Sequence, residues 1–170
     1  MNAKQKELTI EERIARLSEF GKAAIEYGAK GWSTHPCKPR SKAPLGKLVP
    51  RGLLDASRNP EMLCSWYEQY PDANVAIRTG KESEIWVLDI DGEEGKASLI
   101  ELQEEFGELA DPLIVETPGG GLHLYYAYPL VGVVGCRANI RPGIDVRGDG
   151  GYVMAPPSIH PSGGRYEWLS

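Results

Sequence analysis

The sequence has little cysteine, which limits the kinds of site that it can build. Among its 170 residues are three cysteines, Cys37, Cys64 and Cys136, and no two of them form a C-x-x-C pair. A disulfide framework and a zinc finger are therefore not expected. We interpret each cysteine as an ordinary small apolar residue, which is consistent with a reducing compartment.

Long apolar runs are also missing. No stretch approaches the roughly 20 apolar residues of a membrane-spanning helix, and the polar N-terminus does not resemble a signal peptide. We expect a cytoplasmic protein with no membrane partner. The net charge of -5 argues against a domain that binds nucleic acid over its whole surface, although it permits a local basic patch.

The hydrophobic patterns predict a single α+β domain over residues 1–170. Abundant glycine (20) and proline (13) favour turns over a helical bundle. A helix is predicted from a capping box at Thr9 and Glu12 to residue 27, with Gly28 as its stop. The predicted helices are 10–27, 61–70 and 95–106, the last with Leu99, Leu102 and Phe106 facing inward. The predicted strands are 74–77, 83–91, 113–117, 122–126, 144–147, 152–155 and 165–169.

Two connecting segments receive specific predictions. Residues 31–52 contain four prolines and are predicted to be irregular. The segment Gly-Asp-Gly-Gly at 148–151 predicts a hairpin turn that joins strand 144–147 to strand 152–155. Residues 131–142 give no clear pattern.

The apolar strand around residues 85–91 ends in two carboxylates. Because side chains alternate along a strand, Asp89 and Asp91 share one face, opposite Leu88 and Ile90. Two like charges so close together stay ionised when a cation lies between them, and Mg²⁺ or Mn²⁺ prefers such oxygen ligands. The alternative is that both aspartates are solvated turn residues, and the D-x-D pattern alone does not decide between the two.

Two later strands carry further candidates. Asp145 shares a strand face with Arg147 and could be the third carboxylate of a two-metal site, or a surface residue paired with that arginine. His123 follows the glycine run that includes Gly120 and Gly121, with only Leu122 between them, and exposed backbone N–H groups there could bind an anion. The alternative for His123 is an ordinary histidine of the sheet.

A basic segment lies in the predicted irregular region. It contains no acidic residue and five basic ones, namely Lys38, Arg40, Lys42, Lys47 and Arg51. The segment could contact phosphates of a nucleotide or of a nucleic-acid backbone, or it could be a solvated loop.

The order of these pieces is more specific than any one of them. K-A-P, V-L-D-I-D-G, T-P-G-G-G-L-H-L-Y-Y, G-I-D-V-R-G-D-G-G-Y-V and A-P-P-S-I-H-P-S-G-G-R-Y-E-W follow one another over residues 32–168. This order resembles the bifunctional DNA primase/polymerase (prim-pol) N-terminal domain of the archaeo-eukaryotic primase superfamily, as found in plasmid, phage and prophage replication proteins. The resemblance implies an RRM-like antiparallel catalytic sheet with flanking helices and an N-terminal α/β portion. It places the active site in the cleft between them, with the family region at 31–170 after a helical segment at 1–30.

The resemblance also implies roles for particular residues. Asp89, Asp91 and Asp145 match the metal-binding carboxylates, with Mg²⁺ or Mn²⁺ as cofactor, and His123 matches the histidine that contacts the phosphates of the incoming nucleotide. The chain departs from the pattern at Gly121, where a hydroxyl residue is usual, and it has no zinc-binding module. We assign nucleotide binding to His123, Lys42, Gly120, Gly121 and Arg147, and nucleic-acid binding to Lys38, Arg40 and Lys47.

The expected function is therefore template-directed nucleotidyl transfer by a DNA primase and polymerase. Its partners would be a single-stranded DNA template, a primer, dNTPs or rNTPs, and a helicase module in the full-length protein. Two alternatives use the same residues. A metal-dependent phosphodiesterase or nuclease would degrade a labelled strand, and a non-catalytic template- or origin-binding module would incorporate no nucleotide.

Overall fold

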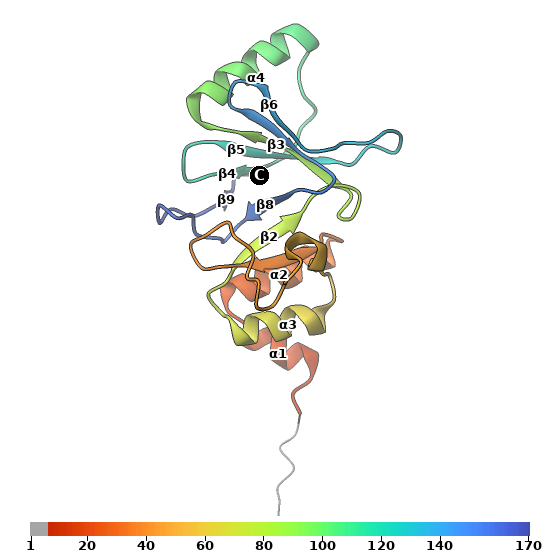
Figure 1. Ribbon diagram of the computed structural model, residues 1–170, viewed down its shortest axis with the longest axis vertical. Coiled ribbons are helices and arrows are strands. Elements are labelled where there is room, and N and C mark those ends of the chain that lie inside the picture. The colour runs from red at the N-terminus through yellow and green to blue at the C-terminus, as the bar shows by residue number, and fades with distance from the viewer. Residues whose placement is uncertain (1–6) are drawn as a thin grey trace, which may run out of the picture.

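The computed structural model describes residues 7–170 and contains two antiparallel sheets with helices at either end of the molecule (Figure 1). The smaller sheet has the order β1-β2-β8 and lies beside the N-terminal helices. The strands of this sheet are β1 (Thr34–Cys37), β2 (Asn74–Arg78) and β8 (Tyr152–Ala155). The helices of this part of the molecule are α1 (Ile10–Arg16), α2 (Glu19–Ala29), the 3₁₀ helix η1 (Gly52–Asp55) and α3 (Pro60–Gln69). The predicted N-terminal α/β portion is thus present.

The larger sheet has the order β6-β7-β3-β5-β4-β9, with every pair antiparallel. Its strands are β3 (Ile85–Ile90), β4 (Leu113–Glu116), β5 (Leu122–Ala127), β6 (Arg137–Arg141), β7 (Ile144–Arg147) and β9 (Glu167–Trp168). The helix α4 (Gly92–Phe106) follows β3 in the chain. The four middle strands place β3 between β7 and β5, as expected of an RRM-like sheet. The predicted α+β class is confirmed. No helix within residues 7–170 is long and apolar enough to cross a membrane.

The two faces of β3 are buried in different environments. Leu88 and Ile90 pack with Leu124 and Ile144 in a small core beneath α4. Val87 belongs instead to the main core, which joins the larger sheet to β2, β8 and the helices α2 and α3. This alternation turns Asp89 toward the smaller sheet, on the face opposite Leu88 and Ile90, and that opposition is what the sequence pattern predicted.

The prediction of one N-terminal helix over residues 10–27 is wrong, because this segment forms two helices, α1 and α2. Leu17 is extended, and the Ser18 hydroxyl accepts a hydrogen bond from the Gly21 backbone N–H, so that Ser18 caps a second helix. That helix continues past Gly28 to Ala29. The predicted capping box at Thr9 is present.

Two further predictions need correction, one about a sheet edge and one about the end of a helix. The region predicted to be irregular contains β1, which pairs with β2 along its whole length. Pro36 is tolerated there because its nitrogen points away from β2: Thr34, two residues earlier, makes its backbone hydrogen bonds to Ser57 on that side, and the Pro36 carbonyl accepts there from the Leu45 N–H. Phe106, predicted to face inward from the third helix, is 73% exposed because it is the last residue of α4.

Residues 148–151 do not form the predicted hairpin. β7 belongs to the larger sheet and β8 to the smaller one, so this segment crosses between the sheets. The Thr79 hydroxyl donates to the Gly148 carbonyl at 2.7 Å, and the Thr79 backbone N–H donates to the Gly151 carbonyl at 2.9 Å. The second crossing, from β2 to β3, therefore lies directly beside the first.

Close packing of the two crossings depends on Gly80. Gly80 has a φ of 93°, and a Cβ there would lie 2.6 Å from Asp149 Cα. We expect Gly80→Ala to lower the free energy of unfolding by roughly 2–4 kcal/mol, as the sum of backbone strain and overpacking. Gly150→Ala is the matched control, since Gly150 has a φ of 78° with nothing within 4 Å of the added Cβ. Urea unfolding should show a clearly smaller loss for Gly150→Ala, and equal losses would contradict the packing argument.

Candidate active site

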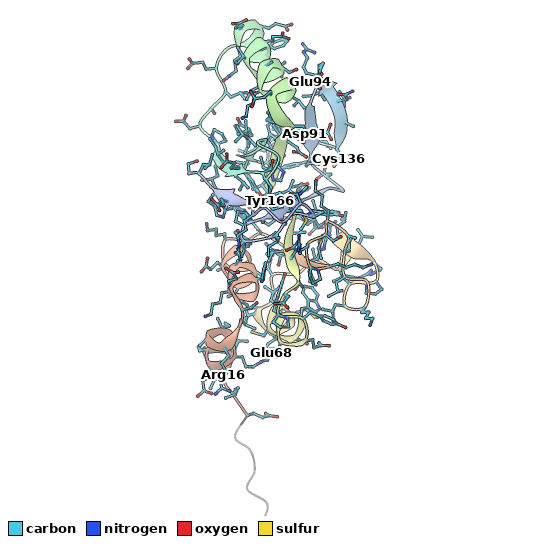
Figure 2. The ribbon with its side chains drawn as sticks, turned by 90° about the vertical axis from the view of Figure 1, so that its left-hand side faces the viewer. Arg16, Glu68, Asp91, Glu94, Cys136 and Tyr166 are labelled. Carbon is cyan, nitrogen blue, oxygen red and sulfur yellow. The ribbon has the colours of Figure 1, made fainter. Side chains whose placement is uncertain are left out.

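A cavity of about 340 Å³ lies where the two sheets meet. The larger sheet contributes Asp89 and His123 to its wall, and the smaller sheet contributes residues of β8. The complete lining is Lys42, Asp89, His123, Cys136, Arg147, Gly150, Gly151, Tyr152, Val153, Met154 and Tyr166. In Figure 2, Asp91, Cys136 and Tyr166 lie in the middle of the molecule, whereas Arg16 and Glu68 lie among the helices at one end.

Asp89 lies at the centre of a row of polar residues that crosses three strands. It is the register partner of His123 on β5 and of Asp145 on β7. Its Oδ1 lies 3.4 Å from His123 Nε2, and its Oδ2 lies 3.4 Å from Arg147 Nη2. Burial alone would raise the pKa of Asp89, but the contacts with His123 and Arg147 hold it below its ordinary value. Asp89 is therefore an ionised, largely buried carboxylate.

Asp91 follows the end of β3 and has a different environment. Its side chain is exposed and makes no hydrogen bond to any residue from 7 to 170. Partial burial and the negative charges of Asp89 and Asp145 raise its pKa, while Lys42 and Arg147 oppose this shift. The two aspartates of the D-x-D pattern and Asp145 are thus close enough to repel one another.

Asp145 is held in a fixed orientation by two donors. Its Oδ2 accepts from Arg147 Nη2 at 2.8 Å, and its Oδ1 accepts from the backbone N–H of Asn139 at 2.8 Å. Asn139 lies in the irregular part of the β6–β7 pairing and has a φ of 58°. The strand that the sequence did not predict, β6, thus contributes to the placement of a candidate catalytic carboxylate.

His123 is buried beside the cavity, with 6% of its surface exposed. Its Nδ1 is enclosed and has no hydrogen-bond partner within residues 7–170. Its ring lies 5.8 Å from the ring of Tyr166 and is tilted by 32°. Because Nδ1 is enclosed, any contact of His123 with a ligand in the cavity would be made by Nε2, the nitrogen beside Asp89.

The glycine turn before His123 packs against the end of β3. A Cβ at Gly121 would overlap the Ile90 carbonyl oxygen and lie 3.0 Å from Thr117 Oγ1, so only glycine fits there. The Gly120 N–H donates to the Thr117 carbonyl at 2.9 Å within the turn. Neither Gly120 nor Gly121 belongs to the cavity lining.

The basic segment divides into two parts. Lys42 lines the cavity, and its backbone carbonyl accepts a hydrogen bond from Tyr152 Oη at 3.0 Å. Lys38, Arg40 and Lys47 are exposed and lie outside the lining. The segment therefore offers one cation to the cavity and three to its surroundings, and the fifth, Arg51, is paired with Asp55.

Several cavity residues were not predicted from the sequence. Cys136 lies in the segment without a clear pattern, and Tyr152, Val153 and Met154 come from the strand that crosses to the other sheet. Tyr166 precedes β9, in the R-Y-E-W motif that contributed to the resemblance, but nothing in the motif indicated a role for the tyrosine itself.

Asp89, Asp91 and Asp145 can be compared with what a divalent cation requires of its ligands. Within residues 7–170, no three His, Cys, Asp or Glu side chains are grouped closely enough to hold a metal ion. The Arg147 guanidinium instead compensates the charges of Asp89 and Asp145. Asp89, Asp91 and Asp145 still offer the hard oxygen donors that Mg²⁺ and Mn²⁺ prefer, and the repulsion felt by Asp91 is what a cation would relieve. The donor set thus fits such an ion chemically.

A comparison with protein families gives a match that covers most of the chain. The family model for bifunctional DNA primase/polymerase, N-terminal (Prim-Pol), matches residues 24–170. The match includes every candidate site residue named above. A search of curated proteins found no match to this chain.

Proposed function

Since this chain belongs to the family of bifunctional DNA primase/polymerase N-terminal domains, which implies nucleotidyl transfer of that type, we propose that the cavity beside Asp89 binds the incoming nucleotide. The observation that carries the proposal is the row of Asp89, His123 and Asp145 across three strands, with Arg147 beside it. Of these residues Asp89, His123 and Arg147 line the cavity, so that anionic and cationic groups lie on the same wall, with Asp145 next to them outside the lining. A nucleotide needs both, because its phosphates bind cations and its reacting centre needs metal ligands.

The cationic groups would bind the triphosphate. Arg147 presents its guanidinium from β7, Lys42 its ammonium from the opposite wall, and His123 a ring nitrogen from β5. Guanidinium groups bind phosphate oxygens in a bidentate manner, and lysine binds them as a point charge. These residues would orient the α-phosphate toward a 3′-hydroxyl and stabilise the pyrophosphate that leaves.

The carboxylates would hold the cofactor. Asp89, Asp91 and Asp145 are the residues that we assign to Mg²⁺ or Mn²⁺. A bound divalent cation would activate the attacking oxygen and neutralise charge on the transferred phosphoryl group. The protein's own contribution is to keep Asp89 ionised, through His123 and Arg147, and to fix Asp145 through the N–H of Asn139.

The wider setting follows the family pattern. We propose that the domain acts in a replication protein of phage, prophage or plasmid type, in the cytoplasm, on a single-stranded DNA template and primer. A helicase module would belong to the full-length protein. The resemblance of the ordered motifs supports these assignments.

A primer-extension assay tests the proposed function. With a labelled primer on a longer template, Mg²⁺ or Mn²⁺ and nucleotides, the primer should lengthen, and an unprimed template should yield short products if the domain also primes. Shortening of the labelled strand would instead support the nuclease alternative. Binding of template without any incorporation would support the non-catalytic alternative.

The exposed part of the basic segment gives a prediction about template binding. Replacing Lys38, Arg40 and Lys47 together by alanine should reduce the slope of log K against log salt by up to about 2, because each single-strand phosphate contact releases about 0.7 counterion. The measurement is fluorescence anisotropy with single-stranded DNA at several salt concentrations.

A charge-matched variant controls for the loss of net charge. Arg16, Lys22 and Lys30 are exposed on or next to the N-terminal helices and lie outside the cavity lining, and Figure 2 shows Arg16 at that end of the molecule. Replacing these three residues by alanine removes the same charge and should leave the slope unchanged. An equal effect of both triple variants would show that the basic segment makes no specific contact with the template.

A further inference from the structure

Gly121 occupies the position at which the resemblance described above implies a hydroxyl residue. The backbone of Gly121 packs so closely on Ile90 and Thr117 that no side chain fits. A hydroxyl donor for the nucleotide therefore cannot come from position 121 without moving β3, and the Thr117 hydroxyl beside it belongs to a residue outside the cavity lining. If the cavity uses such a donor, another element must supply it.

Tyr166 is positioned to supply one. It lines the cavity together with His123, and its ring lies 5.8 Å from the imidazole. Its hydroxyl makes no hydrogen bond to any residue from 7 to 170. The hydroxyls of Tyr125 and Tyr126 also lack partners, but these two are completely enclosed. The Tyr166 hydroxyl, in contrast, is not completely enclosed. Because Tyr166 lines the cavity, its hydroxyl is accessible from there.

The Tyr166 side chain is also held in place. Only 3% of the residue is exposed, and its backbone N–H donates to the Ser158 carbonyl at 3.0 Å. The Ser158 hydroxyl in turn donates to the Val75 carbonyl and accepts from the Val75 N–H, which fixes the segment to β2. The hydroxyl is therefore presented to the cavity by a rigid support, so that little conformational entropy is lost on binding.

The chemistry of the hydroxyl suits an acceptor such as phosphate. Burial and the nearby charge of Asp89 raise the pKa of Tyr166 to about 12, so the group remains a neutral donor at any ordinary assay pH. A phosphate oxygen has no proton to donate and needs donors around it. Three other groups of the lining, His123, Arg147 and Lys42, are donors of the kind that surround phosphates, and the Asp89 carboxylate lies beside His123 and Arg147.

We propose that the Tyr166 hydroxyl donates a hydrogen bond to a phosphate oxygen of the nucleotide bound beside His123, and so replaces the hydroxyl that the glycine turn lacks. This inference rests on the proposed function, because it places the nucleotide in the same cavity. It adds a binding residue from the segment before β9, which packs against Pro118 at the start of the glycine turn. The contact is to the phosphates and not to the sugar, so it does not select between dNTPs and rNTPs.

The test uses Tyr166→Phe, which keeps the buried ring and removes only the hydroxyl. Tyr126→Phe is the matched control, because it removes an unpaired hydroxyl from β5 on the α4 side of the sheet. Nucleotide affinity is measured without template by titration calorimetry, for dNTP, rNTP and inorganic tripolyphosphate. Extension kinetics are measured beside it. A hydrogen bond to a charged acceptor predicts that Tyr166→Phe weakens all three ligands by about 10- to 100-fold.

The outcomes separate this inference from the proposed function. Unchanged affinities, or a loss confined to dNTP or to rNTP, would overturn the phosphate contact even if the protein extends primers. If the wild-type protein binds nucleotides but extends no primer, the proposed function is wrong, and the calorimetric comparison still decides on Tyr166. If the wild-type protein binds none of the ligands, both are wrong. Equal losses for Tyr126→Phe would also overturn the assignment, because they would trace the effect to the sheet as a whole.

Discussion

Replacing Asp91 by alanine is expected to abolish nucleotide incorporation without weakening the fold. The carboxylate would be a ligand of the catalytic cation, and loss of such a ligand removes several kcal/mol of transition-state stabilisation, or about 10³-fold or more in rate. The side chain of Asp91 makes no hydrogen bond to any residue from 7 to 170, and it is repelled by Asp89 and Asp145. Its removal should therefore leave the free energy of unfolding unchanged or slightly higher.

This separation of activity from stability makes Asp91 a better test than Asp89. Asp89→Ala should also abolish incorporation, but it would leave His123 and Arg147 without their shared carboxylate in a buried position. Part of any loss of activity could then come from a disturbed site. Asp91 avoids this difficulty because nothing in the described part of the chain is bonded to its side chain.

The measurement combines primer extension with urea unfolding on the same preparations. Asp72→Ala is a suitable control, since Asp72 is an exposed aspartate between α3 and β2, outside the cavity. The control should extend primers at the wild-type rate. Normal extension by a folded Asp91→Ala protein would refute the proposed metal-dependent mechanism.

The centre of the site could be predicted from the sequence because strand alternation is a local rule. The run of apolar residues around Asp89 defines β3, and alternation then fixes which side chains share the face of Asp89. The same rule applied to β5 places His123 and Tyr125 on one face and Leu124 on the other, as the structure has it. The pairing of β3 with both β5 and β7 brings Asp89, His123 and Asp145 to one level.

The opposite wall could not be predicted in this way because it depends on pairing between distant segments. A glycine-rich turn between two short strands usually joins them in one sheet, yet residues 148–151 lead from one sheet to the other. The crossing is held by Thr79 and Gly80, about 70 residues away in the chain, and no local pattern reports such contacts. Cys136, Tyr152 and Tyr166 reach the cavity only as a result of these long-range contacts.

Replacing His123 by alanine is expected to impair nucleotide binding more than any other step. If its ring nitrogen contacts the triphosphate, the contact exists in the ground state as well as in the transition state, so KM for the nucleotide should rise. A charge-assisted hydrogen bond predicts a loss in kcat/KM of roughly 10- to 150-fold, which is less than the loss expected for Asp91→Ala. Template affinity should hardly change, because the contact is to the nucleotide.

A second histidine near the cavity provides the control. His160 also lies near Tyr166, with 6.2 Å between the two rings, but it is not part of the lining, and its Nδ1 lies within hydrogen-bonding distance of the Ser162 hydroxyl. His160→Ala should leave nucleotide kinetics unchanged. The experiment is a nucleotide titration of both variants and the wild type, with a template-binding isotherm for each. Wild-type kinetics in a folded His123→Ala protein would mean that His123 is a structural residue of the sheet. A rise in KM for the nucleotide that occurs with His123→Ala and not with His160→Ala would support a contact between His123 and the nucleotide. Loss of packing alone would lower stability without changing KM.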